Sequence, residues 1–447
     1  MPLAGLSIGK RSALLLDKEN MTKYSISPMS SLYELYLRHP RISTDSRRIE
    51  PDSVFFALRG ASFDGNRFAA DALEKGAAYA VVDDPSLPNT RPDKADRLIV
   101  VDDALQTLQT LAREHRRELG LPILAITGSN GKTTTKELVS RVLAEKYEVY
   151  ATRGNLNNHI GVPLTLLAMT RDVEFGIVEM GASACGEIAL LCSIAEPNYG
   201  IVTNIGRAHL EGFGGPEGVR RGKGELYDWL ARTGGRVFVP ANDPVLMSMA
   251  AERETLAAEC YPTTLADGVE HHLEGDYNRF NVAAAVAVGR YFGVDDERIR
   301  YAVGSYRPDN HRSQKIRTGQ NTLILDCYNA NPSSMQASLV NFRQEPLESC
   351  TRKILILGDM LELGDWSDAE HRHIISLAAE IPDARILLVG PHFAKAYRSL
   401  ESRPADTTLY PSQEALAAEL RKHPVSQALI LVKGSHSIGL ERLADLL

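Results

Sequence analysis

The sequence lacks the features that mark secreted, membrane-spanning or nucleic-acid-binding proteins. Its five cysteines form no CxxC pair and are odd in number, so a disulfide framework is not expected. It has no apolar run of about 18 residues, the length that a membrane-spanning helix needs. Its formal net charge is −7 and no stripe of lysine and arginine stands out, which argues against nucleic-acid binding. We therefore expect a soluble, cytoplasmic protein that acts on small molecules, as a monomer.

The chain is long enough for three domains, and its pattern indicates an α/β fold. At about 150 residues per domain, 447 residues suggest three domains. Strands that alternate with helices indicate parallel sheets. We expect a loosely ordered extension over 1–28, a small α/β domain over 29–103, a central P-loop-type domain over 104–312 and a C-terminal Rossmann-like domain over 313–447. The C-terminal part has no GxGxxG motif, so dinucleotide binding is not expected there.

Short apolar runs bounded by turn residues are typical of strands that are buried on both faces. The expected strands are 54–58, 78–82, 98–101, 123–126, 175–179, 199–204, 322–326, 353–358, 385–389 and 428–433. Longer segments with apolar residues at helical spacing lie between them. The clearest expected helices are 67–75, 105–119, 133–145, 276–292 and 368–381.

A glycine-containing loop separates the strand at 123–126 from the helix at 133–145. Glycines let backbone N–H groups turn toward phosphate oxygens, and the start of a helix adds free donors and a favourable dipole. Lys132 would neutralise the β- and γ-phosphates, and the Thr133 hydroxyl would hold Mg²⁺. The residues expected to bind ATP here are Thr127, Gly128, Ser129, Asn130, Gly131, Lys132, Thr133 and Thr134.

The loop departs from the common GxxxxGK[ST] form, because Ile126 occupies the position of the first glycine. A glycine turn with a solvated lysine is the alternative interpretation. The strand–loop–helix context favours phosphate binding.

Three further residues are candidates for a metal site. Glu179 ends a core strand, where a carboxylate faces the ligand crevice of a parallel sheet, although a glutamate there could also cap a helix. His209 lies in a glycine-bounded loop after the next strand, and its alternative is a structural histidine. Lys223, 14 residues further on, would by itself be taken for a solvent-facing lysine.

In combination, the segments at 128–134, 179, 209 and 223 resemble the Mur ligase family, whose members use ATP to join amino acids or peptides to a UDP-linked muramoyl substrate. The resemblance implies that Lys223 is carbamylated and helps to bind a second Mg²⁺. It implies Thr133, Glu179, His209 and Lys223 as metal ligands. The catalytic residues that it implies are Lys132, His209, Lys223 and Arg312.

Two longer segments resemble the branch of this family that adds D-alanyl-D-alanine to UDP-N-acetylmuramoyl-tripeptide. These are 155–163 and 326–335, the second being the most specific, with support from 357–364 and 432–435. The resemblance extends the ATP site to Asn278, Asn281, Arg312 and Asp326. It makes 29–103 a UDP-substrate-binding domain. The residues expected to bind substrate are Thr44, Asp45, Ser46, Arg47, Asn155, Asn157, Asn158, Ser183, Asn329 and Asn331.

Some of these residues also have a simpler interpretation. Asn278 and Asn281 share one helix face and could cap the helix start as well as contact adenine. The segment 44–47 could be a strand and turn with a helix cap. Three features depart from the family pattern: Asn66 replaces a histidine, His436 replaces an arginine, and the stretch 242–275 is short. Ligand contacts at the first two positions are therefore left open.

The expected reaction activates a carboxylate as an acyl phosphate, which the free amine of D-alanyl-D-alanine then attacks. Catalysis would rest on positioning and charge neutralisation, and two domains that each carry half of the site imply closure on binding. Two alternatives remain. The first is another carboxylate–amine ligase, such as a folylpolyglutamate synthase or a Mur ligase for a single amino acid. The second is a P-loop switch that uses nucleotide for assembly.

Overall fold

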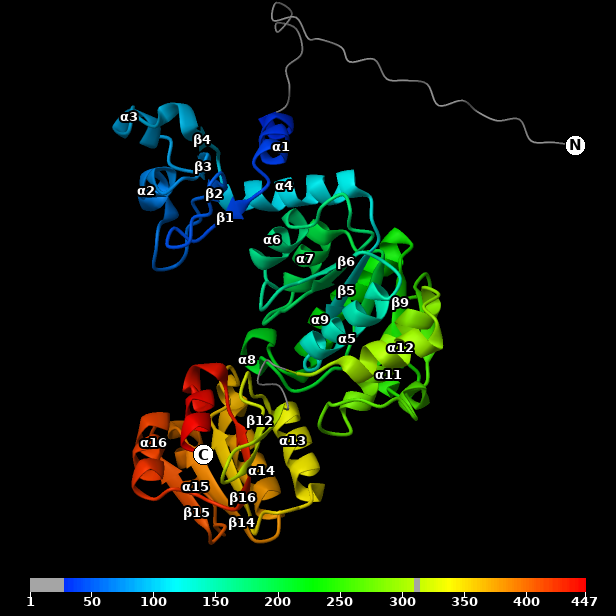
Figure 1. Cartoon of the computed structure of the whole chain (residues 1–447), viewed down its shortest axis with the longest axis vertical. Helices are drawn as coiled ribbons and strands as arrows, with labels where there is room; N and C mark the ends of the chain where they lie inside the picture. Colours follow the sequence, from blue (N-terminus) through cyan, green and yellow to red (C-terminus); the bar gives the residue numbers. More distant parts are fainter. Residues whose placement is uncertain (1–27, 309–313) are drawn as a thin grey trace, which may run out of the picture.

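The computed structural model describes residues 28–308 and 314–447, which form three α/β units that follow one another along the chain (Figure 1). The predicted fold class is confirmed. The predicted extension over 1–28 falls on residues 1–27, which lie outside the described residues, and on Pro28, which already begins helix α1 (Pro28–Arg38). Among the described helices, none is long and apolar enough to cross a membrane.

The N-terminal unit is built on a parallel sheet with the strand order β1-β2-β3-β4. Its strands are β1 (Ile42–Ser43), β2 (Val54–Phe56), β3 (Tyr79–Val82) and β4 (Leu98–Val100), and its helices are α2 (Ala69–Glu74) and the single turn α3 (Leu87–Thr90). Phe55 of β2 and Leu73 of α2 belong to the small core of this unit. The predicted helix at 67–75 therefore begins as a 3-10 turn (Gly65–Phe68) and continues as α2.

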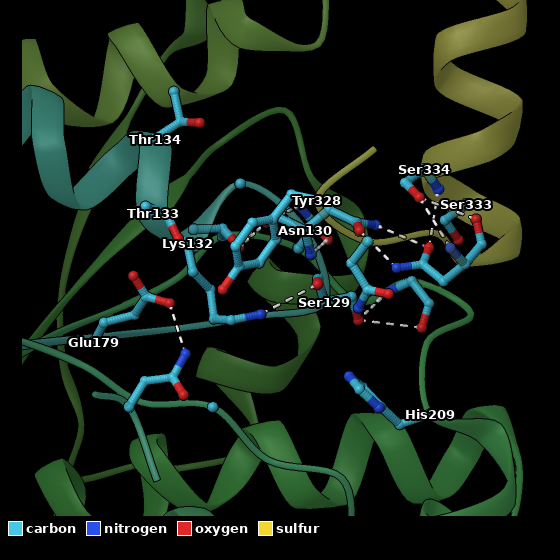
Figure 2. A pocket seen from close by; sticks show the side chains of 18 of the residues that line it. Ser129, Asn130, Lys132, Thr133, Thr134, Glu179, His209, Tyr328, Ser333 and Ser334 are labelled. Atoms are coloured by element: carbon cyan, nitrogen blue, oxygen red, sulfur yellow. Dashed lines mark hydrogen bonds between the residues drawn. The ribbon is translucent and has the colours of Figure 1, made fainter. Parts of the chain in front are cut away.

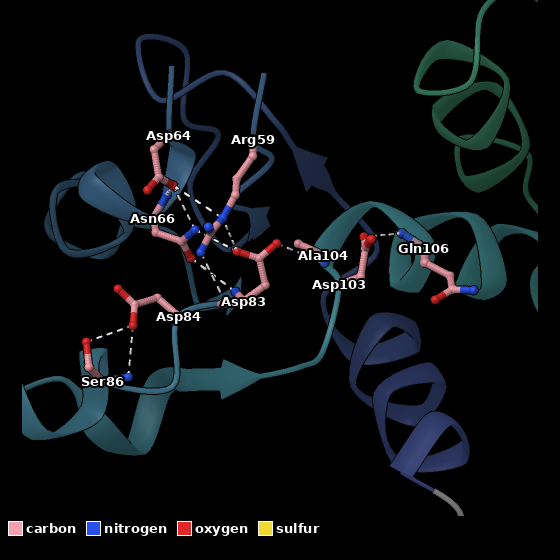
Figure 3. Close-up of polar contacts among 9 residues, drawn as sticks. All are labelled: Arg59, Asp64, Asn66, Asp83, Asp84, Ser86, Asp103, Ala104 and Gln106. Carbon is pink, nitrogen blue, oxygen red and sulfur yellow. Dashed lines mark hydrogen bonds and ion pairs between the residues drawn. The ribbon is translucent and has the colours of Figure 1, made fainter. Parts of the chain in front are cut away.

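Asn66, which stands where the resemblance predicts a histidine, is the centre of a polar network in this unit (Figure 3). Its amide donates to Asp64 Oδ1 at 2.8 Å and to Asp83 Oδ1 at 2.7 Å, and its carbonyl accepts from Asp83 N at 3.1 Å. Arg59 Nε also donates to Asp83 Oδ1, at 2.7 Å, and Asp83 Oδ2 accepts from Ala104 N at 3.4 Å. Both amide hydrogens of Asn66 are used inside the network. Asn66 thereby joins the loop of Asp64 to Asp83, and Asp83 in turn contacts Ala104 at the start of α4.

The central unit is a six-stranded parallel sheet with the order β10-β9-β8-β5-β7-β6. Its strands are β5 (Ile123–Thr127), β6 (Val149–Ala151), β7 (Phe175–Glu179), β8 (Tyr199–Val202), β9 (Arg236–Pro240) and β10 (Ala257–Tyr261). Its helices are α4 (Ala104–Leu119), α5 (Lys132–Ala144), α6 (Gly161–Leu167), α7 (Glu187–Ala195), α8 (Leu210–Phe213), α9 (Pro216–Thr233), α10 (Pro244–Ala251), α11 (Asn278–Tyr291) and α12 (Asp296–Ser305).

The middle strand β5 shows why the apolar runs form this sheet. All five of its residues are buried. Ile123 and Ala125 pack in one core with α4, α6, α7 and α9, whereas Leu124 and Ile126 pack in another with α5, α11 and α12. A strand with helices on both faces needs apolar side chains in both directions, which gives a continuous apolar run. The sheet is thus covered on both sides, and its ligand-binding edge is left at the strand ends.

The C-terminal unit has a second six-stranded sheet with the order β11-β12-β16-β13-β14-β15, parallel except for β11. Its strands are β11 (Gln314–Arg317), β12 (Thr322–Leu325), β13 (Arg352–Gly358), β14 (Ala384–Val389), β15 (Thr407–Tyr410) and β16 (Ala428–Lys433). Its helices are α13 (Pro332–Gln344), α14 (Ser367–Ala379), α15 (Pro391–Arg398) and α16 (Gln413–Lys422). Leu355 and Leu357 pack toward α13, α14 and α15, and Ile354 and Ile356 toward α16.

The short helix α8 of the central unit packs into the core of the C-terminal unit. Leu210 and Phe213 are buried in the same apolar cluster as Met335, Met360 and Leu363. Figure 1 shows α8 at the junction between the two units. Apolar burial of this kind stabilises the docked arrangement, because it removes the side chains from water. The segment that carries His209 is thereby anchored to the C-terminal unit.

Candidate active site

A cavity of about 940 Å³ lies between the central and C-terminal units. Its walls include residues that follow β5, β7, β8 and β12, and Lys433 at the end of β16. The carboxyl ends of parallel strands are where α/β folds bind ligands. Figure 2 shows Lys132 and Glu179 on one side of this cavity and Ser333 and Ser334 on the other.

The phosphate loop, residues 128–134, depends on two glycines. Gly128 has a backbone φ of +138° and Gly131 a φ of +80°, and residues other than glycine rarely adopt such values. A Cβ atom on Gly128 would lie 2.0 Å from Thr203 Oγ1, and one on Gly131 would lie 2.7 Å from Asn281 Oδ1. The loop therefore passes closer to the end of β8 and to α11 than any larger residue would allow.

Two residues that follow β8 form hydrogen bonds with Ser129 and Asn130, in the middle of the phosphate loop. Asn204 Oδ1 accepts from Asn130 N at 3.0 Å, and Asn204 Nδ2 donates to Asn130 O at 2.9 Å. Asn204 O accepts from Ser129 N at 3.1 Å, and Thr203 Oγ1 donates to Asn130 O at 2.5 Å. These bonds fix the direction of the loop, so the first turn of α5 begins at the wall of the cavity.

The charge for a polyphosphate comes from Lys132 and from the start of α5. Lys132 Nζ donates to Gly128 O at 2.8 Å and to Ser129 O at 3.2 Å, which holds the ammonium against the loop. Thr133 and Thr134 follow in the first helical turn and line the cavity with Lys132. A helix start with a lysine is a suitable anion site, because free N–H donors and positive charge converge there. Thr127, which was also predicted to bind ATP, is not among the residues that line the cavity, and its hydroxyl donates to Met180 O at 2.7 Å.

Glu179 is a buried carboxylate with one oxygen left for a ligand. Its side chain is 2% exposed. Asn157 Nδ2 donates to Oε1 at 2.9 Å, whereas Oε2 has no hydrogen-bond partner within the described structure. An unpartnered buried carboxylate oxygen at the edge of a cavity costs free energy unless a cation or donor satisfies it. Asn157, predicted to bind substrate, thus orients Glu179.

The donor set around Glu179 fits a hard divalent cation. The Thr133 hydroxyl oxygen and the Glu179 carboxylate are the oxygen ligands that Mg²⁺ prefers, and both line the cavity. Within residues 28–308 and 314–447, no three His, Cys, Asp or Glu side chains converge as a metal cluster. A Mg²⁺ ion here would therefore need further oxygens from phosphate or from a modified side chain, which is how Mg²⁺ is held in many nucleotide sites.

Lys223 is buried in α9, next to the loop that follows β7. Its side chain is 1% exposed, and Nζ donates to Ala182 O at 3.1 Å and lies 5.1 Å from the centre of the Phe213 ring. Burial lowers the pKa of the Lys223 ammonium well below its ordinary value, and Lys132 lowers it further against the opposing effect of Glu187. The interpretation of Lys223 as a solvent-facing lysine is wrong. A buried amine of this kind is available as a nucleophile, because less of it is protonated.

His209 lines the cavity from the loop before α8, and Figure 2 shows it below the phosphate loop. Its Nδ1 is bonded to Glu362 Oε2, a carboxylate of the C-terminal unit. The hydrogen bond from His209 lowers the pKa of Glu362 below its ordinary value, against burial, which raises it. Sequence reasoning named the segment 357–364 but assigned no role to Glu362.

Asn278 and Asn281 lie on the same face of α11 and line the cavity, as their spacing predicts. Thr135 Oγ1 donates to Asn281 Oδ1 at 3.0 Å, and Asn281 Nδ2 donates to Asn278 Oδ1 at 2.8 Å. Asn278 Nδ2 donates to Glu274 O at 2.7 Å. The two amides therefore bind α11 to α5, and adenine contact stays a prediction.

Lys433 is a cavity residue that sequence reasoning assigned no role. It ends β16 beside Asp326, which follows β12, and its side chain is 2% exposed. Lys433 Nζ donates to Asp326 Oδ2 at 2.5 Å and to Asp326 O at 3.3 Å, and Ser338 Oγ donates to Asp326 Oδ2 at 2.7 Å. A lysine paired with Asp326 reduces the repulsion that a carboxylate would exert on a nearby polyphosphate.

The other residues predicted to bind substrate divide into two groups. Asn158, Ser183, Asn329 and Asn331 line the cavity, and Asn331 Nδ2 donates to Asn130 Oδ1 at 2.8 Å, across the two units. Asn155 is exposed and is not among the cavity residues.

Two further predictions concern residues for which the cavity gives no test. The segment of Thr44, Asp45, Ser46 and Arg47 lies in the N-terminal unit, where Arg47 pairs with Asp45 at 2.8 Å. Arg312 lies outside the described residues. The roles of all five remain predictions.

Comparison with known families covers most of the chain. Residues 40–116 match the model described as the Mur ligase family, catalytic domain. Residues 126–264 match the Mur ligase middle domain, and residues 311–436 match the Mur ligase, glutamate ligase domain. The three matches follow the three units in order.

The chain is also similar to individual proteins over nearly its whole length. It is 34% identical to the UDP-N-acetylmuramoyl-tripeptide–D-alanyl-D-alanine ligase of Bacillus subtilis (strain 168), over 90% of this chain and 92% of that protein. A crystal structure of MurF from Acinetobacter baumannii aligns with a TM-score of 0.79 at 30% identity, over 91% of this chain and 93% of that one. The MurF ligase of Thermotoga maritima in complex with ADP aligns with a TM-score of 0.77 at 25% identity, over 92% and 97% of the two chains.

The substitution Gly128→Ala tests the geometry of the phosphate loop. The added methyl group would meet Thr203 at 2.0 Å and would force alanine to a φ of +138°. We expect the affinity for ADP, measured by titration calorimetry, to fall by at least ~10-fold, because the loop must move away from its binding geometry. Gly154→Ala is the matched control, with a φ of +55° but no atom within 4 Å of the new methyl group. Equal ADP affinity in both variants would contradict the assigned loop geometry.

Proposed function

The chain belongs to the Mur ligase family, and we propose that it is the ATP-dependent ligase that adds D-alanyl-D-alanine to UDP-N-acetylmuramoyl-tripeptide. The products are ADP, phosphate and UDP-N-acetylmuramoyl-pentapeptide, a precursor of peptidoglycan. The observation that carries this proposal is a cavity that joins a phosphate loop to residues of the 326–335 segment from the other unit. The identity to ligases of this specificity, 34% and 30% over 90% of the chain, also supports it.

The proposed reaction overcomes the low reactivity of a carboxylate at neutral pH. One carboxylate oxygen of the tripeptide attacks the γ-phosphorus of ATP, the bond to the β-phosphate oxygen breaks, and ADP leaves. The amine of D-alanyl-D-alanine then attacks the acyl carbon, a proton is lost, and phosphate leaves with the former carboxylate oxygen. Lys132 and the start of α5 would stabilise the charge on the phosphoryl group, since positioning and charge neutralisation dominate such transfers.

We include in the proposal two Mg²⁺ sites, whose protein ligands would be Thr133, Glu179, His209 and a carbamylated Lys223. Mg²⁺ would supply positive charge to the phosphate oxygens. The unpartnered Oε2 atom of Glu179 and the burial of Lys223 support this assignment. Lys223 would add to CO₂ through its neutral amine and release one proton, which gives a carbamate with two ligand oxygens.

The remaining parts of the proposal concern the rest of the chain. The N-terminal unit, over 29–103, would bind the UDP end of the substrate, while 104–312 and 313–447 would close around ATP. Arg312, at the junction, would contact the ATP phosphates, and Asp326 the nucleotide. A cytoplasmic monomer is the simplest form, since the substrates are nucleotide-linked and small.

The most direct assay measures ADP release by the full chain. We expect ADP release that requires both UDP-N-acetylmuramoyl-tripeptide and D-alanyl-D-alanine, because the acyl phosphate forms only with the first and is consumed only by the second. Omission of either compound, at saturating ATP, is the control. Hydrolysis that neither compound alters would point to a nucleotide switch, and a preference for a single amino acid would point to another ligase.

The carbamate on Lys223 can be tested separately. With ¹³C-bicarbonate we expect a carbamate signal in the ¹³C NMR spectrum of the native chain, and its loss in Lys223→Ala together with at least a ~100-fold lower kcat. Lys353→Ala is the control, because burial also lowers the pKa of Lys353, but that lysine lies in the C-terminal unit, where its Nζ donates to Phe342 O and Arg343 O. A native chain without the signal, with Lys223→Ala fully active, would exclude the carbamate.

A further inference from the structure

The loop that follows β13 carries Glu362 from the C-terminal unit to His209 of the central unit. Besides the contact between Glu362 Oε2 and His209 Nδ1, Glu211 N donates to Glu362 O at 3.2 Å. His209 has a φ of +52° and Glu362 a φ of +62°. This left-handed conformation is strained for residues other than glycine, so packing must hold both residues in place.

The C-terminal unit fixes one end of this loop through a fully buried histidine. His371 Nδ1 donates to Ser367 O at 2.7 Å, and its Nε2 accepts from Met360 N at 3.1 Å. The Nδ1 bond orients the ring within α14, and the Nε2 bond attaches Met360, two positions before Glu362, to that helix. Burial lowers the pKa of His371, which favours the neutral ring that this arrangement needs.

Other bonds fix the same loop from β16 and α15. Leu361 N donates to Ser435 Oγ at 3.1 Å, and Ser435 N donates to Asp359 O at 3.2 Å. The Asp359 carboxylate accepts from His392 N at 2.9 Å and Phe393 N at 2.8 Å, at the start of α15. The loop is therefore rigidly held by its own unit, and Glu362 reaches the cavity from a fixed position.

The contact with Glu362 determines which nitrogen of the His209 ring carries the proton. A neutral imidazole has one N–H donor and one acceptor nitrogen, and the bond at one nitrogen decides the role of the other. A carboxylate at Nδ1 requires the proton to be on Nδ1, which leaves Nε2 as the acceptor. Histidines that bind metals are commonly oriented in this way by a carboxylate, and loss of that carboxylate typically lowers metal affinity or activity by roughly 10–100-fold.

We propose that Glu362 is a positioning residue that docks with the C-terminal unit, holds His209 as the Nδ1–H tautomer and so turns Nε2 toward the reacting end of the cavity. This inference rests on the proposed function, in which His209 is a ligand of a Mg²⁺ ion. It makes completion of the metal site depend on closure of the two units. Neither unit alone contains both members of the pair.

A second ion pair between the units provides a matched comparison. Arg207 pairs with Glu370 of α14, whose side chain is 2% exposed, and Arg207 N donates to Ser333 Oγ at 2.7 Å. Like the contact of Glu362, this pair joins the segment before α8 to the C-terminal unit. It is made by Arg207 and not by the imidazole ring of His209. Loss of Glu370 should weaken docking and leave the tautomer of His209 unchanged.

The kinetic experiment uses Glu362→Leu, Glu362→Gln and Glu370→Leu, each in the native chain and in the His209→Gln variant. Leucine cannot accept a hydrogen bond, whereas the glutamine oxygen can. We expect Glu362→Leu to lower kcat by roughly 10–100-fold with the KM for ATP within about twofold, and Glu362→Gln to restore most of it. In the His209→Gln background Glu362→Leu should have little further effect, while the loss in Glu370→Leu should persist.

A spectroscopic measurement on the full chain without nucleotide gives a second, independent readout. The ring ¹⁵N signals of His209 should report the Nδ1–H tautomer in the native chain, in Glu362→Gln and in Glu370→Leu, but not in Glu362→Leu. The inference is overturned if Glu362→Leu leaves these signals unchanged, or if its kinetic loss adds to that of His209→Gln as the loss in Glu370→Leu does. Failure of the proposed function would appear differently, as a native chain without substrate-dependent ADP release.

Discussion

The close approach of the phosphate loop to the end of β8 is the constraint on which the rest of the site depends. Only glycine fits at position 128, because the space that a methyl group needs is already occupied by Thr203. Thr203 and Asn204 then bind the Asn130 carbonyl, and these contacts fix the direction in which α5 begins. The position of Lys132 and Thr133 at the cavity wall follows from that direction, and so does the contact of Asn130 with Asn331 of the C-terminal unit.

The site is divided between two units, and this division suits a ligase. The central unit carries the phosphate loop and Glu179, whereas the C-terminal unit carries Asp326, Lys433 and Glu362. An acyl phosphate is rapidly lost to water in an open site, so a reaction of this kind gains from a cavity that is complete only when two units close around it. The buried contacts of α8 with the C-terminal core show that the two units share an apolar interface in this arrangement.

Sequence reasoning predicted the parts of the fold whose physical signal is local. Strands such as β7 and β13, buried on both faces, leave continuous apolar runs, and the structure confirms them. Five of the six edge strands of the described sheets, β1, β6, β10, β11 and β15, were missed, because they are very short or partly exposed and carry no such run. The inner strand β9 was also missed, although most of it is buried.

The site could be predicted only in part for a related reason. The phosphate loop and Glu179 are recognisable from their place after a strand. Two other pairs of the site join residues more than 100 positions apart, Glu362 with His209 and Lys433 with Asp326. No local sequence pattern indicates such contacts. The contact of Asn157 with Glu179 could not be predicted either. In a sequence, an asparagine that orients a carboxylate cannot be distinguished from one that binds substrate.

The central claim is that two units assemble one cavity in which a substrate carboxylate is activated by phosphoryl transfer. The most direct test follows the carboxylate oxygen. With ¹⁸O in the terminal carboxylate of UDP-N-acetylmuramoyl-tripeptide, the account predicts one ¹⁸O atom in each phosphate released, because the acyl phosphate breaks at its carbon–oxygen bond when the amine attacks. Phosphate that carries no ¹⁸O, formed while the pentapeptide product accumulates, would contradict it.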